Sequence, residues 1–216
     1  MVHLATAASV VVGDGIAPPV TDALMAAADR LVAQGATLLT TTCGFLIELQ
    51  QQLQHRINIP VVSSSLLLLP LLRQTYGAGA RIGIMTFDAR QLSPHHLDVV
   101  TPMPVAGTGS DAGAGSDTAS KTTESAFPDQ FCVLGMEKSQ HFYPMIRDDH
   151  LTGSADHLRD DVLRVAEGFA GRQIQALVLE CTNLSPFKAD LQQQLNIQVF
   201  DIFDILHLLM PTPSPA

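Results

Sequence analysis

Short apolar runs alternate along the chain with amphipathic stretches. The runs have the length of strands, and the stretches have the spacing of helices. We predict strands at Ser9–Val12, Ala36–Thr41, Ile59–Ser63, Ala80–Thr86, Phe131–Gly135, Ile174–Glu180 and Ile197–Asp201. We predict helices at Val20–Gln34, Phe45–Arg56, Ser65–Thr75, Pro94–Val100, Ala155–Gly171, Pro186–Leu195 and Ile202–Met210. The alternation predicts an α/β fold with parallel sheets and with helices on the sheet faces.

One segment departs from this pattern. Gly107–Ala126 is rich in Gly, Ser, Thr and Ala and contains no large apolar residue. It cannot bury enough surface to offset the entropy lost on ordering, so we predict a flexible surface insert. Its glycines lack the GxGxxG spacing of a dinucleotide-binding turn.

The chain contains a weak internal repeat. Aligning Cys43 with Cys181, an offset of 138 residues, gives ten identities without a gap over Leu38–Leu71. The identities include Leu39 with Leu177, Leu53 with Leu191, Asn58 with Asn196 and Val61 with Val199. The matched order of strand, cysteine, helix, strand and helix predicts two similar α/β units.

We therefore divide the chain into two pseudo-symmetric lobes, residues 1–79 and residues 80–216 with the insert at 107–126. The last helix is in a position to pack back on the first lobe. The second lobe opens with the strand and helix of Ala80–Val100, for which the first lobe has no counterpart, so we expect the first lobe to lack its opening strand. An unpaired sheet edge of this kind favours a homo-oligomer.

Composition narrows the range of partners. The formal net charge of −9 argues against binding to nucleic acid. The longest apolar run, Leu66–Leu72, is too short to cross a membrane and contains Pro70, so we expect a cytoplasmic protein. Three widely spaced cysteines with no CxxC predict free thiols, with neither a disulfide framework nor a metal site.

Two of the cysteines lie where parallel α/β sheets bind ligands. Cys43 and Cys181 each follow the carboxyl end of a predicted strand and precede a predicted helix. In the second motif, Ser185 and Pro186 are expected to be the N-cap and the first residue of that helix. The amino end of a helix stabilises anions and lowers the pKa of a nearby thiol. If the lobes face each other, the two thiols meet in one cleft.

Two thiols across a cleft suit the inversion of a carbon that carries an acidic hydrogen. One thiolate removes the proton from one face, and the opposite thiol returns a proton to the other face. Thr42, Thr182 and Asn183 could hydrogen-bond the developing enolate, and Ser63 and Ser64 could bind a carboxylate. The predicted substrate contacts are these five residues together with Gly44 and Thr86.

The motifs TTTCGFL and LECTNLSP, with NIPVVSSSLL and ARIGIMT between them, resemble the aspartate/glutamate/hydantoin racemase superfamily. The resemblance implies two flavodoxin-like lobes, an active site between them and no cofactor. It also implies that Cys43 and Cys181 are the acid–base pair and that Thr182 contacts the substrate. The expected function is racemisation or epimerisation of an amino acid or a related small carboxylate.

Other functions remain open. Maleate-type cis–trans isomerases also use paired cysteines, and a chain of this family could bind a small acid without any chemistry. Pyridoxal phosphate chemistry is rejected, because the lysines Lys121, Lys138 and Lys188 have no phosphate-binding glycine loop nearby. Exchange of the substrate's α-hydrogen with deuterated solvent distinguishes an enzyme from a binding protein.

Overall fold

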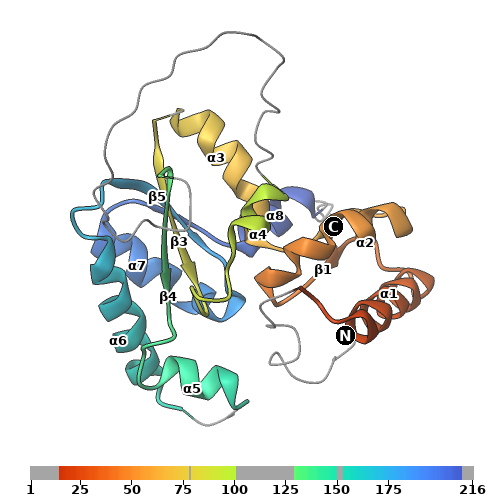
Figure 1. Ribbon diagram of the computed structural model, residues 1–216, viewed down its shortest axis with the longest axis horizontal. Coiled ribbons are helices and arrows are strands. Elements are labelled where there is room, and N and C mark those ends of the chain that lie inside the picture. The colour runs from red at the N-terminus through yellow and green to blue at the C-terminus, as the bar shows by residue number, and fades with distance from the viewer. Residues whose placement is uncertain (1–14, 78, 101–128, 150–152, 211–216) are drawn as a thin grey trace, which may run out of the picture.

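The computed structural model describes residues 15–77, 79–100, 129–149 and 153–210 (Figure 1). The predicted strand Ser9–Val12 and the insert Gly107–Ala126 lie outside the described residues. The strands are β1 (Leu39–Thr40), β2 (Val61–Val62), β3 (Arg81–Thr86), β4 (Phe131–Gly135), β5 (Ile174–Leu179) and β6 (Gln198–Phe200). The α-helices are α1 (Pro18–Ala33), α2 (Gln50–Arg56), α3 (Leu69–Tyr76), α4 (Pro94–Asp98), α5 (Phe142–Arg147), α6 (Ala155–Ala166), α7 (Lys188–Leu195) and α8 (Ile202–Leu209). The 3-10 helices are η2 (Gly44–Leu49), η3 (Ser65–Leu68), η4 (Glu167–Phe169) and η5 (Thr182–Phe187).

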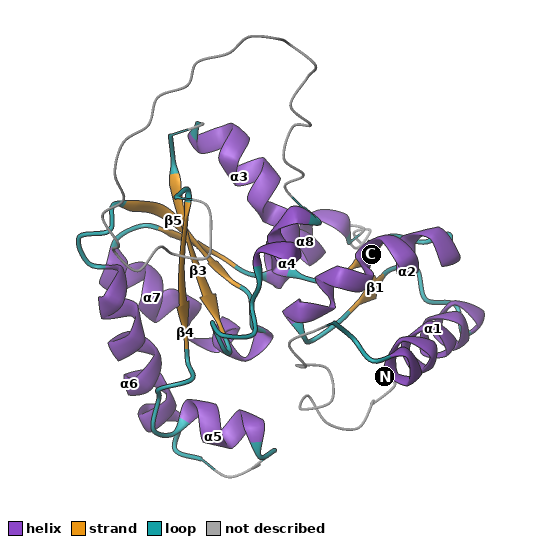
Figure 2. Ribbon diagram, viewed as in Figure 1, coloured by secondary structure: helices purple, strands orange, loops and turns teal. Residues whose placement is uncertain are grey.

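The larger sheet is parallel and has helices on both faces, as the sequence predicts. Its strand order is β4-β3-β5-β6, and β3 pairs with β4 through Ile82 and Phe131 and with β5 through Met85 and Leu179. Figure 2 shows these strands enclosed by helices. Crossovers through helices connect parallel strands, so the carboxyl ends of β3 and β5 meet at one edge of the sheet.

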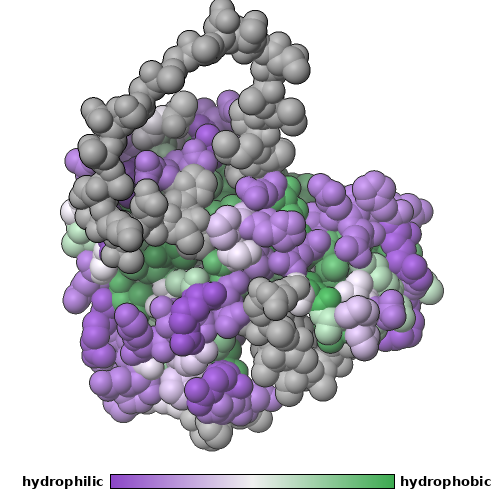
Figure 3. Space-filling model, viewed as in Figure 1, coloured by the Kyte–Doolittle hydropathy of each residue, from purple (hydrophilic) through white to green (hydrophobic). Residues whose placement is uncertain are grey.

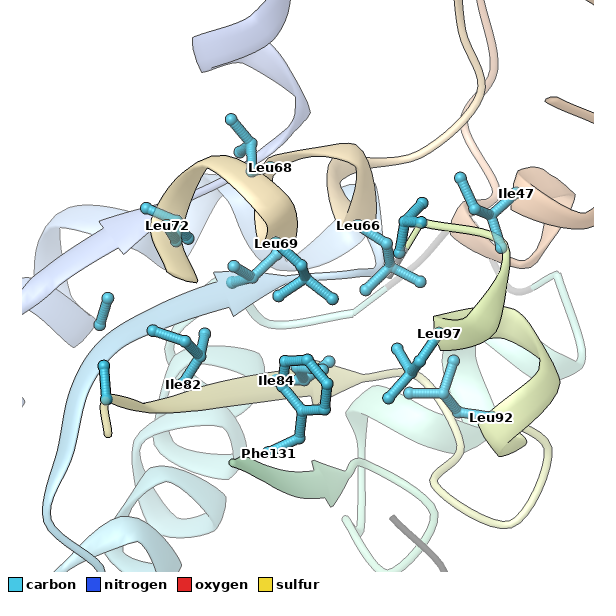
Figure 4. Packing of buried hydrophobic residues seen from close by; sticks show 14 of the residues in the cluster. Ile47, Leu66, Leu68, Leu69, Leu72, Ile82, Ile84, Leu92, Leu97 and Phe131 are labelled. Carbon is cyan, nitrogen blue, oxygen red and sulfur yellow. The ribbon is translucent and has the colours of Figure 1, made fainter. Parts of the chain in front are cut away.

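One face of this sheet is covered by leucines from the first half of the chain. Leu66 and Leu69, on η3 and α3, pack against Ile82 and Ile84 of β3 (Figure 4). All four side chains are fully buried. Truncating a leucine at such a position to alanine costs about 2–5 kcal/mol.

The opposite face carries the alternate residues of the same strands. Met85 and Leu177 face this side and pack with Val162 of α6 and Leu191 of α7. This division follows from the period-two alternation of side chains along a strand. Because both faces are buried, β3 and β5 read as nearly continuous apolar runs.

The smaller sheet consists of β1 and β2, which are also parallel and are shorter than predicted. The side chain of Thr41 donates to the Ser63 carbonyl at 2.7 Å, and the Ser63 amide donates to Oε1 of Gln50 at 3.0 Å. Side chains therefore hydrogen-bond the backbone groups of Ser63 that would otherwise have extended the pairing of β1 with β2. Helices α1 and α2 and this sheet share a core that includes Leu39, Leu53 and Val61.

The internal repeat is visible in the elements. Helices η2 and η5 each begin directly after a cysteine, are six residues long and lead into an α-helix, α2 or α7. The repeats also exchange elements: η3 and α3 cover the larger sheet, and α8 contacts β2 and η3. A boundary at residue 79 therefore separates α3 from the strand against which it packs.

Two helix predictions were wrong in detail, and one helix was missed. The helix expected to start at Pro186 is preceded by η5, so Cys181 holds the N-cap place expected for Ser185, and Pro186 lies inside the 3-10 helix. Helix α6 ends at Ala166 and continues as η4 to Phe169, short of Gly171, whose φ of 73° is in the left-handed region. Helix α5 was not predicted; Pro144 lies in its first turn, where a helix tolerates proline.

Polar residues cover most of the face in Figure 3. Over the described residues, no helix combines the length and the apolar character needed to cross a membrane. Exposed large hydrophobic side chains gather on and just after α8, at Phe203, Leu208, Leu209 and Met210. The homo-oligomer and the cytoplasmic location remain predictions.

Candidate active site

A cavity of about 190 Å³ lies between the two cysteine-bearing turns. It is small, which suits a ligand of a few heavy atoms. The lining residues are Thr42, Cys43, Gly44, Phe45, Phe87, Asp88, Gln91, Tyr143, Ile146, Arg147, Glu180, Cys181 and Asn183. They come from both cysteine turns, from the connection between β3 and α4, and from α5.

Cys43 is the N-cap residue of η2 and is half-buried. Burial raises the pKa of its thiol to about 12, and the nearby carboxylate of Glu180 also raises it. Hydrogen bonds from the backbone N–H groups of Phe45 and Leu46 to the sulfur act in the opposite direction. The structure therefore provides donors for a thiolate, but the raised pKa keeps the thiol protonated at neutral pH.

Cys181 has the corresponding place in the second turn and is buried. Its thiol pKa is raised, first by burial and then by the charge of Glu180, while hydrogen bonds from the backbone and side chain of Asn183 lower it. A thiolate at Cys43 would also raise the pKa of Cys181, so the two sulfurs interact. The prediction that the helix amino ends lower both thiol pKa values was wrong, because desolvation outweighs the N–H groups.

Glu180 lies between the two turns, and sequence reasoning missed it as a site residue. Its side chain is buried, and Oε2 accepts a hydrogen bond from the Thr86 hydroxyl at 2.7 Å. Its other oxygen, Oε1, has no hydrogen-bond partner. Burial raises the pKa of Glu180 to about 7, although hydrogen bonds from Thr86 and the Phe87 backbone lower it. A charged residue directly after an apolar strand and before a cysteine was the available signal.

Gly44 makes room for this carboxyl. A Cβ atom at Gly44 would overlap both Oε1 and the backbone oxygen of Glu180. The close approach of the two turns therefore requires glycine at position 44. The turns are also joined by a hydrogen bond from the Thr182 hydroxyl to the Thr42 carbonyl.

A further part of the wall combines an aromatic pair with charged groups, and sequence reasoning missed this part as well. Phe87 stacks on Tyr143 with the ring centroids 4.6 Å apart. Asp88 is buried and accepts hydrogen bonds from Tyr143 at 2.8 Å and from Arg90 at 2.6 Å. Burial acts to raise the pKa of Asp88, but the donors outweigh it and hold that pKa below its ordinary value. The guanidinium of Arg147 lies 5.7 Å from the Tyr143 ring centroid.

The predicted site residues fall into two groups. Cys43, Cys181, Thr42, Gly44 and Asn183 line the cavity.

The other four predicted contacts are not among the residues that line the cavity, and internal hydrogen bonds engage their hydroxyls. Thr86 donates to Glu180 and Thr182 to Thr42, as described above. Ser63 donates to Gln50 at 2.7 Å, and Ser64 caps η3 by accepting from Leu66 N–H at 3.2 Å. Over the described residues, no group of His, Cys, Asp and Glu is arranged to hold a metal ion.

Sequence comparison relates the chain to a group of lyases. No protein-family model matches the sequence. The chain is 25% identical over 170 residues to a dimethylsulfoniopropionate lyase of Durusdinium sp. clade D, and the aligned region covers 78% of this chain and 50% of that protein. It is 23% identical over 201 residues to dimethylsulfoniopropionate lyase 5 of Emiliania huxleyi (strain CCMP1516), and the aligned region covers 90% of this chain and 36% of that protein. The chain thus spans half or less of the length of these relatives.

Structural comparison finds similarity to a glutamate racemase. The chain matches the crystal structure of glutamate racemase from Francisella tularensis subsp. tularensis SCHU S4 in complex with D-glutamate, with a TM-score of 0.52 and 15% sequence identity. The match covers 94% of this chain and 70% of that chain. Similarity at this level of identity concerns the fold, and it agrees with the predicted α/β architecture of flavodoxin-like lobes with parallel sheets. The chain therefore has a fold similar to that of this racemase.

Proposed function

We propose that the chain is an enzyme that removes a proton from the carbon next to a carboxylate, with Cys43 and Cys181 as the acid–base pair. The observation that carries this proposal is that two cysteines, one from each repeat, line one small cavity. Each sulfur accepts hydrogen bonds from the turn that follows it. These donors stabilise a thiolate when one forms.

Racemisation or epimerisation follows if both thiols act. A thiolate on one face takes the α-proton, and the thiol on the other face donates a proton to the resulting enolate. Exchanging the two roles gives the reverse reaction. No step needs an electron sink beyond the substrate carboxylate, so we propose a cofactor-independent reaction.

The carboxylate of the substrate needs a counter-charge, and Arg147 is placed to supply it. Among the described residues that line the cavity, Arg147 is the one with a positive charge. Its ion pair with Asp148, at 2.7 Å, leaves donors of the planar guanidinium for a second carboxylate. The Asn183 amide could hydrogen-bond the enolate as it forms.

A β-elimination is the second candidate, and the similarity to dimethylsulfoniopropionate lyases favours it. In that substrate the carbon beside the α-carbon carries a sulfonium leaving group. One thiolate takes the α-proton, and the electron pair of the C–H bond forms a carbon–carbon double bond. The carbon–sulfur bond breaks at the same time, so that dimethyl sulfide departs and acrylate is the other product. This outcome uses the same first step but needs one base instead of two.

One experiment tests proton removal and separates the candidate functions. The purified chain is incubated in deuterated water with both enantiomers of a panel of amino acids, with hydantoins, maleate and dimethylsulfoniopropionate, and is followed by NMR. Deuterium at the α-carbon with inversion supports a racemase, acrylate with dimethyl sulfide supports a lyase, and fumarate supports a cis–trans isomerase. Binding without exchange or turnover of any compound contradicts the proposal and supports the small-acid-binding protein.

A further inference from the structure

We propose that Glu180 is a positioning residue that holds the proton exchanged with the two active-site thiols. When a thiolate forms at Cys43 or Cys181, the carboxyl takes up the proton that leaves the sulfur: the S–H bond breaks, an O–H bond forms at Oε1, and the S–H electron pair remains on sulfur. The inference deepens the proposed function and rests on the two cysteines being the acid–base pair.

The position of Glu180 in the two turns is the first argument. It directly precedes Cys181 at the end of β5, and its backbone N–H donates to the Met85 carbonyl at 2.8 Å. Its side chain reaches back to Gly44, the residue after Cys43. One carboxyl is therefore adjacent to both cysteine turns.

The hydrogen bonds of the carboxyl are the second argument. Oε2 is fixed by the Thr86 hydroxyl, whereas Oε1 is buried without a partner. A buried carboxylate oxygen without a donor costs about 1–3 kcal/mol or more. A proton on Oε1 lowers this cost, because a neutral carboxyl is desolvated far more easily than a carboxylate.

The electrostatics of the cavity is the third argument. An ionised Glu180 raises the pKa of both thiols, so a carboxylate and a thiolate disfavour each other. Burial leaves the carboxyl able to take up a proton near neutral pH. The other titratable or charged groups that line the cavity are Asp88, Tyr143 and Arg147, and Asp88 already accepts from Arg90 and Tyr143. We infer that Glu180 and the two thiols share a single negative charge.

Shared charge has a measurable consequence for thiol reactivity. Below the pKa of Glu180, the small thiolate fraction rises about tenfold per pH unit, as for any thiol. Above that pKa, forming the thiolate requires only an internal proton transfer, which does not depend on pH. The alkylation rate of Cys43 and Cys181 should therefore level off near pH 7.

The test measures alkylation of each cysteine by iodoacetamide between about pH 5.5 and pH 9.5, read by mass spectrometry of peptides. In the unmodified chain, we expect a rise, an inflection near pH 7 and a plateau. In Glu180→Gln, which keeps the shape of the side chain, the rate should rise about 100-fold between pH 7 and pH 9. Glu180→Asp should retain an inflection, and Glu167→Gln, at an exposed site outside the cavity, should keep the original profile.

The alkylation rates are measured without any substrate. If Glu180→Gln folds with an unchanged circular dichroism spectrum and keeps the plateau, the proposal is wrong. If neither cysteine reacts with iodoacetamide or with the small neutral reagent methyl methanethiolsulfonate, the proposal is also wrong, because it requires a thiolate in the folded chain. A plateau that depends on Glu180, in a chain that exchanges no substrate hydrogen, would support this inference and reject the proposed function.

Discussion

The turn that carries Cys43 and the turn that carries Cys181 follow the same course of strand end, cysteine, 3-10 helix and α-helix. They differ at the residue before the cysteine. Thr42 is exposed, whereas Glu180, its counterpart in the repeat, is buried with an unpartnered oxygen. Duplication therefore explains the two sulfurs and their N–H donors, but the charge between them comes from one turn only.

The residues after the cysteines differ in a complementary way. Gly44 has no side chain where the Glu180 carboxyl lies, and Thr182, at the equivalent place, reaches across to the Thr42 carbonyl. Each turn thus contributes a different contact: the first turn leaves space at Gly44 for the Glu180 carboxyl, and the second turn supplies the Thr182 hydroxyl. The difference shows that a pseudo-symmetric site can become chemically asymmetric through two or three positions.

The largest effect is expected from the cysteines, where the two turns should be equally important for racemisation. Cys43→Ala and Cys181→Ala should each lower turnover by about 10²–10⁴-fold, because each removes the acid–base group on one face of the substrate. Residual α-hydrogen exchange should favour opposite enantiomers in the two variants, as followed by NMR in deuterated water.

The control for this pair is Cys132→Ala, which removes a buried thiol of β4 outside the cavity and should leave the chemistry intact. Loss of activity in only one of the two variants would indicate a single base, as a lyase requires. Normal turnover in both would exclude thiol chemistry.

The next effect is specific to Glu180. Its folded-state pKa, about 7, exceeds the ordinary value of 4.5, so the folded chain binds this proton more tightly than the unfolded chain. The resulting stability is complete below about pH 4.5 and is lost as the pH rises through 7. As the pH rises from about 4.5 to above 7, the titration of Glu180 should lower the free energy of unfolding by about 3 kcal/mol.

Urea unfolding of the unmodified chain and of Glu180→Gln at about pH 5 and pH 8 measures this difference. The variant should lose less stability between the two values, and Glu167→Gln should behave as the unmodified chain does. Equal pH dependence in all three would show that Glu180 titrates normally.

A smaller effect is expected at Gly44. Gly44→Ala introduces a Cβ atom onto the backbone oxygen of Glu180, which cannot move without distorting β5. We expect a loss of about 1–3 kcal/mol in the free energy of unfolding by urea. The matched control is Gly79→Ala, where nothing lies within 4 Å of the added atom. A fully stable Gly44→Ala chain would mean that the turns separate easily.

The smallest effect is expected at Thr182. Thr182→Val keeps the shape of the side chain but removes the hydroxyl that donates to the Thr42 carbonyl. The loss should be about 0.5–1.5 kcal/mol in the same urea measurement. Thr75→Val, on the exposed side of α3, serves as the control for a threonine whose hydroxyl only bonds within its own helix. An unchanged Thr182→Val would show that this contact contributes nothing to joining the turns.

The sequence predicted the parts of the molecule that depend on local pattern. The alternation of strands and helices predicted the parallel sheet, and the repeat at an offset of 138 residues predicted that Cys43 and Cys181 meet at one cavity. It could not show that Ser63 and Ser64 use their hydroxyls internally, because this depends on Gln50 and on the turn of η3.

The missed part of the site depends on tertiary contacts. Tyr143 and Arg147 lie on α5, far along the chain from either cysteine, and reach the cavity only because β3 and β4 are neighbours in the larger sheet. The burial of Glu180 likewise depends on the absence of a side chain at Gly44, which is distant in sequence. Neither relation leaves a periodic pattern that could have been read in advance.

The exchange of elements between the repeats has a consequence for folding. A polypeptide that ended at residue 79 would leave Leu66 and Leu69 facing water, because their partners belong to β3 and its neighbours. The complementary fragment would lose the cover of one sheet face, and α8 would lose its contact with β2. We therefore expect that neither half folds by itself and that the full chain unfolds in one cooperative transition, so that the cavity and the core around it are lost together.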